Sequence, residues 1–151
     1  MVSGLVQGVG FRPYVHSLAR SLNLTGYVKN VGGSEVEIVV AGSRDSVSLF
    51  LYRLLLDTPE PAEVEHVIVE EQQQGEYGEF RIERSSGRLY LRSMLPPDFS
   101  ICDDCLREVL DPGDRRFSYP FNSCVWCGPR FSMMYGVPYD RDRTSMRDFP
   151  P

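Results

Sequence analysis

The chain has 151 residues, 42% of them hydrophobic and 25% charged, which is an ordinary composition for a globular protein. Its formal net charge is −5 with an acidic excess in both halves, which argues against the basic face of an extended nucleic-acid binder. The sequence shows neither an apolar run long enough to span a membrane nor the pattern of a secretory signal. We therefore expect a cytoplasmic protein whose thiols stay reduced.

Residues 1–91 predict an α+β module in which strands and helices alternate. The spacing of apolar residues predicts strands over 1–6, 25–30, 35–41, 63–70 and 79–84 and helices over 13–22 and 47–55. Gly32 and Gly33 predict a hairpin turn between the second and third strands. The order β-α-β-β-α-β with an extra strand is typical of the ferredoxin-like sandwich, in which two helices cover one face of an antiparallel sheet.

The first strand leads into a glycine-containing turn, and a helix follows directly. The turn is made of Gln7, Gly8, Val9, Gly10, Phe11 and Arg12. Two glycines let the backbone turn tightly, so that successive N–H groups converge on an anion. The helix N-terminus adds partial positive charge at the same point, and a guanidinium can hold two phosphate oxygens. Without further motifs, the same residues would also fit a tight strand-to-helix turn with a surface arginine.

Two longer motifs favour the anion site over a plain turn with a surface arginine. The string from Val6 to Arg12 resembles the signature of the acylphosphatase family, and the string from Gly26 to Asn30 resembles the family's second strand, which ends in a catalytic asparagine. The resemblance implies that Arg12 binds the phosphate and that Asn30 orients the attacking water. Such a site needs no cofactor, because the arginine and the backbone N–H groups balance the charge. The substrate's own oxygen would then take the proton of the water.

A second module is expected over 98–151, after a proline-containing linker at 92–97. Cys102-x2-Cys105 and Cys124-x2-Cys127 are separated by 18 residues, which is the spacing of a structural zinc site with four thiolate ligands. Two disulfides or an iron–sulfur cluster are the alternatives, and both are less expected in this compartment and at this spacing. In so small a module, metal binding should supply much of the folding free energy.

Arginines and aromatic residues are interleaved between and after the cysteine pairs, at 115–122, 128–131 and 138–144. Such a pattern can bind single-stranded nucleic acid. The acidic residues in the same stretches favour a different interpretation, in which the aromatic side chains pack around the metal site.

The motifs together resemble the N-terminal part of the HypF family, the carbamoyltransferases of nickel–iron hydrogenase maturation. The resemblance implies that the first module hydrolyses carbamoyl phosphate, and that further domains make carbamoyl-adenylate from ATP and transfer the carbamoyl group to a C-terminal cysteine of the partner HypE. Another small acyl phosphate remains an alternative substrate, and we expect no membrane partner.

Two departures from that family lead to the alternative hypotheses. The first strand begins at Met1, later than in the family, and the chain stops at Pro151, before a further cysteine region and before the adenylating and transfer domains. We therefore expect a fragment of a longer protein with a shortened first strand. The alternatives are an inactive phosphate-binding and zinc fragment that docks a partner protein, and a zinc-dependent nucleic-acid binder.

Overall fold

The computed structural model describes residues 1–31, 35–71, 75, 77–85, 97–124, 126–128, 130–136 and 140–149. Its elements in chain order are β1 (Val2–Leu5), α1 (Phe11–Ser21), β2 (Thr25–Val31), β3 (Glu35–Ala41), α2 (Arg44–Leu56), β4 (Glu63–Val67), β5 (Phe80–Ile82), α3 (Asp103–Leu110) and the short 3-10 helices η1 (Phe131–Met133) and η2 (Arg141–Arg143). The predicted turn at Gly32-Gly33 and the predicted linker, except Pro97, lie outside the described residues.

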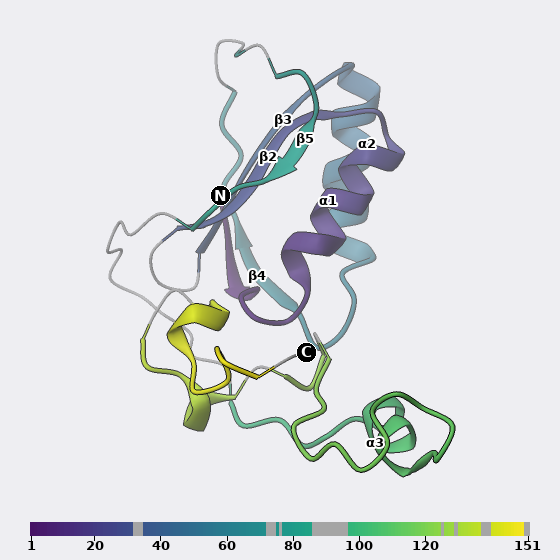
Figure 1. Cartoon of the computed structure of the whole chain (residues 1–151). Coiled ribbons are helices and arrows are strands. Elements are labelled where there is room, and N and C mark those ends of the chain that lie inside the picture. Colours follow the sequence, from purple (N-terminus) through teal and green to yellow (C-terminus); the bar gives the residue numbers. More distant parts are fainter. Residues whose placement is uncertain are drawn as a thin grey trace.

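The described strands form one five-stranded sheet, and its strand order is β4-β1-β3-β2-β5. Helices α1 and α2 lie together on one face of this sheet (Figure 1), which confirms the predicted α+β class. The sheet is mixed, however, so one strand pair departs from the predicted antiparallel arrangement. After β4 the chain crosses to the opposite edge, where β5 pairs parallel to β2, while the other pairs are antiparallel.

Several predicted boundaries shift in the structure. Strand β4 ends at Val67 and β5 spans only Phe80–Ile82, so both are shorter than predicted. Helix α1 begins at Phe11, two residues before the predicted start, because Gly10 takes a left-handed conformation (φ 73°) that ends the turn there. Pro13 still lies in the first helical turn, where its missing N–H costs no helix bond.

The core lies between the sheet and the two helices. Its largest fully buried side chains include Phe11 on α1, Phe50 and Leu54 on α2, and Val28 and Val36 on the central strands. On β2 the residues alternate between a buried face and a partly exposed face, as a strand with a single covered face should. This alternation places Asn30 on the buried face, with Val28, beneath the helices.

The cysteine-containing part lies at the end of the sheet where β1 runs into α1 (Figure 1). In its described residues, the regular structure is limited to α3, η1, η2 and the isolated bridge between Met134 and Thr144. Among the described residues, no helix has both the length and the apolar character needed to cross a membrane.

Candidate functional site

The turn between β1 and α1 is built by glycines and apolar residues in alternation. Gly8 and Gly10 have φ angles of 77° and 73°, in the left-handed region that glycine adopts without strain. The side chains of Val6, Val9 and Phe11 are at most 2% exposed and belong to the core. The apolar residues therefore anchor the turn, while the glycines reverse the backbone between them.

The start of α1 offers unsatisfied positive charge to this turn. The first helical hydrogen bond runs from the Tyr14 N–H to the Gly10 carbonyl, so the preceding N–H groups have no helical acceptor. The N-cap residue, Gly10, has no side chain that could cap the helix, and the first turn contains no acidic residue. The geometry is that of a helix N-terminus prepared to bind an anion.

Arg12 lies at a hollow of about 230 Å³ that the turn shares with the second module. Gly8, Gly10, Phe11 and Arg12 line it together with Asp140 and Arg141. The Nη2 atom of Arg12 donates to Oδ1 of Asp140 at 3.1 Å, and the two side chains are 22% and 30% exposed. Asp140 is a site residue that the sequence did not indicate, although it lies in the stretch 138–144 that is part of the family resemblance.

Asn30 is fully buried on β2, and within the described part of the chain neither its amide nitrogen nor its amide oxygen has a hydrogen-bond partner. A buried polar group without a partner costs about 1–3 kcal/mol. Asn30 does not line the hollow beside Arg12. The structure thus places the two predicted catalytic residues on adjoining elements without bringing both to one open surface.

Gln7 connects the turn to the strand that carries Asn30. Its Nε2 atom donates to the carbonyl of Val31 at 3.3 Å and to the carbonyl of Glu35 at 2.9 Å. Gln7 itself is 5% exposed. The side chain therefore holds the turn against β2 at the residue that follows Asn30.

The four cysteines meet at one point, as their spacing predicted. Their sulfur atoms all lie within 4.8 Å of one another. The Cys102–Cys124 and Cys105–Cys127 pairs are 3.7 Å apart and the Cys124–Cys127 pair is 3.9 Å apart. Ligands 2.3 Å from a tetrahedral zinc ion lie ~3.8 Å from one another, so the sulfur positions fit that ion. A disulfide needs a sulfur separation of about 2 Å, and all four cysteines are free.

The sulfurs are buried or partly buried, and hydrogen bonds hold the backbone around them. Burial raises the pKa of Cys105, so its thiolate needs a positive charge close by. The backbone N–H of Trp126 donates to the Cys124 sulfur at 3.3 Å, and the Gly128 N–H donates to the Cys124 carbonyl at 2.8 Å. Asn122 donates from the buried side to the carbonyl of Cys105 at 3.1 Å. These bonds shape the two turns that present the sulfurs.

Three described aromatic residues of this module are largely exposed, whereas Trp126 lines a hollow together with Cys102 and Cys127. Phe117, Phe121 and Phe131 are 49%, 43% and 54% exposed. Phe121 instead packs against Tyr119 and Phe149, with ring centroids 5.9 Å and 4.6 Å apart. The metal would be held by the two turns and α3, which are ordered by backbone and polar contacts.

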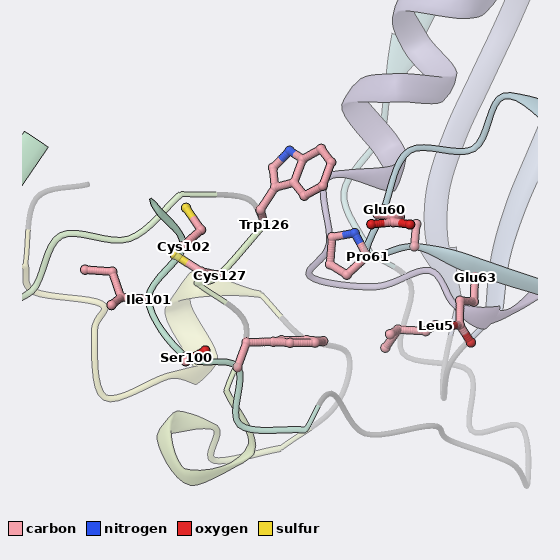
Figure 2. A pocket seen from close by; sticks show the side chains of 11 residues that line it. Leu5, Glu60, Pro61, Glu63, Ser100, Ile101, Cys102, Trp126 and Cys127 are labelled. Atoms are coloured by element: carbon pink, nitrogen blue, oxygen red, sulfur yellow. The ribbon is translucent and has the colours of Figure 1, made fainter. Parts of the chain in front are cut away.

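A larger hollow, of about 420 Å³, separates the two modules beside the cysteines. Figure 2 shows Trp126, Cys102 and Cys127 on one side and Pro61 and Glu63 on the other. Trp126 is the single tryptophan of the chain and is 46% exposed. Its indole therefore reports on both the cysteine cluster and the boundary between the modules.

Comparison with known families assigns both modules. The family model described as acylphosphatase matches residues 1–82. This chain belongs to the acylphosphatase family. The model described as HypF finger matches residues 101–134, over the cysteine cluster. The chain is thus an acylphosphatase domain followed by a HypF-type zinc finger.

Individual relatives repeat this combination. The chain is 44% identical over 143 residues to the probable carbamoyltransferase HypF of Methanocaldococcus jannaschii, which covers 93% of the chain and 18% of the relative. A crystal structure of full-length HypF in a phosphate- and nucleotide-bound form matches with a TM-score of 0.88 and 40% identity, over 99% of this chain and 20% of that one. The acylphosphatase of Treponema denticola is 43% identical over 83 residues, which is 55% of this chain and 87% of the relative. The chain thus spans about a fifth of the HypF relatives and most of a stand-alone acylphosphatase.

Proposed function

We propose that the chain hydrolyses an acyl phosphate, with carbamoyl phosphate as the physiological substrate, to the carboxylate and inorganic phosphate. The observation that carries the proposal is Asn30, a fully buried amide without a partner among the described residues, on the strand that Gln7 ties to the Arg12 turn. A buried amide without hydrogen bonds lowers the stability of the fold unless a ligand or a water molecule binds to it. The HypF relative was solved in a phosphate- and nucleotide-bound form, and phosphate is the product that this reaction would release.

In the proposed reaction, the turn and Arg12 bind the oxygens of the phosphoryl group. Asn30 orients a water whose oxygen attacks phosphorus as the bond to the acyl oxygen breaks. The acyl group leaves as a carboxylate, or as carbamate, and the water's proton passes to a phosphate oxygen. Positioning and charge stabilisation supply the acceleration. Because Asn30 has no exposed surface, the turn must move far enough to admit one water.

The proposal also covers the cysteine cluster and the role of the hydrolysis in a longer protein. The cysteine cluster binds one structural zinc ion through Cys102, Cys105, Cys124 and Cys127, and the acylphosphatase site works without a cofactor. In a longer protein of the HypF type, hydrolysis would be the first step of a carbamoyl transfer that ends on HypE. The acidic net charge disfavours the nucleic-acid alternative.

The test is phosphate release from carbamoyl phosphate and acetyl phosphate by the zinc-loaded chain. We expect turnover, with Arg12→Ala and Asn30→Ala each reducing kcat/KM by about 100-fold. Arg20→Ala is the matched control, because Arg20 is exposed at the far end of α1. A folded protein without turnover would favour the inactive phosphate-binding fragment, and turnover that survives Arg12→Ala would contradict the mechanism.

The zinc assignment has a separate test in the metal content of the purified chain. We expect about one zinc ion per chain, held by four thiolates. Cys105→Ser should lose the metal, since Cys105 is buried in the cluster. An iron content with visible absorption would replace zinc by an iron–sulfur cluster.

A further inference from the structure

We propose that Asp140 of the second module is a positioning residue for Arg12, so that the second module completes the phosphate site of the acylphosphatase domain. The inference rests on the proposed function, because it concerns the same anion site. Asp140 lies outside both family matches, which end at residues 82 and 134. Its side chain nevertheless reaches Arg12, 128 positions earlier in the chain, at 3.1 Å.

The geometry of the contact leaves Arg12 able to bind phosphate. Oδ1 of Asp140 accepts from one nitrogen, Nη2, and the pair does not form the two-pronged contact that would use the whole fork. A guanidinium has five N–H donors, so the others remain for phosphoryl oxygens. The carboxylate therefore fixes one edge of the guanidinium while another edge stays directed to the ligand.

Asp140 is itself held in place by an ordered turn. The Arg143 N–H donates to the Asp140 carbonyl at 2.8 Å, and the buried Thr144 donates from its hydroxyl to the Arg141 carbonyl at 2.8 Å. An isolated bridge joins Thr144 to Met134, next to η1. The turn is thereby tied to the segment that follows the cysteine cluster, which gives Asp140 a fixed position.

The shared hollow explains what this contact adds to the domain. Asp140 and Arg141 line this hollow together with the β1–α1 turn. A stand-alone acylphosphatase such as the Treponema denticola relative matches only 83 residues of this chain, and the acylphosphatase family model stops at residue 82. The arginine of this chain thus has a partner that the acylphosphatase match does not include. A held guanidinium loses less conformational freedom when it binds phosphate, which strengthens binding.

The test measures binding of inorganic phosphate to the zinc-loaded chain by calorimetry, together with KM and kcat for acetyl phosphate. Asp140→Ala should weaken phosphate binding by roughly tenfold, the factor expected for losing one charge-assisted hydrogen bond, and should raise KM more than it lowers kcat. Asp140→Asn should recover part of the loss, because its amide oxygen can still accept from Nη2. Asp142→Asn is the matched control, since it removes an exposed charge two residues away and should bind phosphate as the unaltered chain does.

The double variant Arg12→Ala/Asp140→Ala separates positioning from a general structural effect. If Asp140 acts through Arg12, the double variant binds phosphate no more weakly than Arg12→Ala alone. Zinc content and thermal unfolding of each variant establish that it is folded, and Asp140→Asn keeps the shape of the side chain.

The outcomes distinguish this inference from the proposed function. Tighter phosphate binding by Asp140→Ala would show that the carboxylate competes with phosphate, and unchanged binding would show no role; either result overturns the inference. Phosphate binding that depends on Asp140 without any turnover would support the inference and contradict the proposed hydrolysis. A chain that binds no phosphate would overturn both.

Discussion

The side-chain amide of Gln7 donates to the carbonyl of Val31 at 3.3 Å, and so fastens the β1–α1 turn to the strand that carries Asn30. The same nitrogen also donates to the backbone carbonyl of Glu35, at the start of β3, at 2.9 Å. One buried side chain therefore sets the position of the turn against two strands. In this fold the precision of the anion site depends on β2 and β3 as much as on β1.

Replacing Gln7 by alanine should weaken both the fold and the site. The carbonyls of Val31 and Glu35 would each lose a donor, which should cost about 1–2 kcal/mol in the free energy of unfolding. A looser turn should also lower kcat/KM for acetyl phosphate by about tenfold, since positioning carries the rate. Urea denaturation and phosphate release measure the two effects. Tyr14→Phe is the control, because it removes a bond to the Arg53 carbonyl on the exposed side of α1; equal losses of activity in both variants would contradict a specific role for Gln7.

Asn30→Leu should change stability and activity in opposite directions. The variant replaces an unpaired buried amide by an apolar side chain of similar size, which should raise the free energy of unfolding by about 1 kcal/mol. Hydrolysis should fall by about 100-fold, because no group remains to orient the water. Asn122→Leu is the matched comparison, since its buried amide donates to the Cys105 carbonyl, and it should destabilise the protein. A loss of stability for Asn30→Leu as large as for Asn122→Leu would show that Asn30 serves the fold.

The sequence could predict the parts of the site that depend on local spacing. The turn from Gln7 to Arg12 follows from two glycines between a strand and a helix, and the cysteine cluster follows from two Cys-x2-Cys pairs. The residues of the turn are close in sequence, and the four cysteines have the spacing of ligands to a single ion. The described structure agrees with both predictions.

The parts that sequence could not predict depend on packing between distant segments. The ion pair of Arg12 with Asp140 joins two modules, and no local pattern connects the residues. The parallel pairing of β5 with β2 depends on where the chain crosses the sheet. The complete burial of Asn30 depends on how α1 packs against β2. The exposed Phe117 departs from the predicted packing of aromatic side chains around the metal site, because the spacing in the sequence does not show which face of a loop turns to solvent.

Removal of zinc should unfold the finger and leave the acylphosphatase domain largely intact. The core between the sheet and helices α1 and α2 contains no cysteine, whereas the finger has the four sulfurs as its centre. Chelation should therefore shift the emission of Trp126, whose backbone N–H donates to the Cys124 sulfur, while most of the helical circular dichroism persists. Readdition of zinc should restore the emission. Simultaneous loss of both signals would mean that the acylphosphatase domain does not stay folded without the finger.

The network around Glu37 should make stability depend on pH in the acid range. The Nζ atom of Lys29 lies 2.8 Å from Oε1 of Glu37, and the Tyr27 hydroxyl donates to the same oxygen at 2.6 Å. Burial alone would raise the pKa of Glu37, but the hydrogen bonds from Lys29 and Tyr27 outweigh it and hold the pKa below its ordinary value of 4.5. A carboxylate with a lowered pKa stabilises the fold above pH 4.5, and this contribution is lost as the pH falls through the lowered value.

Glu37→Gln tests this dependence directly. At neutral pH the variant should be less stable by about 0.5–1 kcal/mol at low salt, because it loses the ion pair with Lys29. The difference should shrink as the pH falls below 4.5, since Glu37 in the unaltered chain then becomes protonated. Urea denaturation at a series of pH values measures the effect, with Glu79→Gln as a control whose exposed pair with Arg81 should contribute little. A difference that stays constant into the acid range would mean that packing of Glu37, and not its charge, stabilises this face of the sheet.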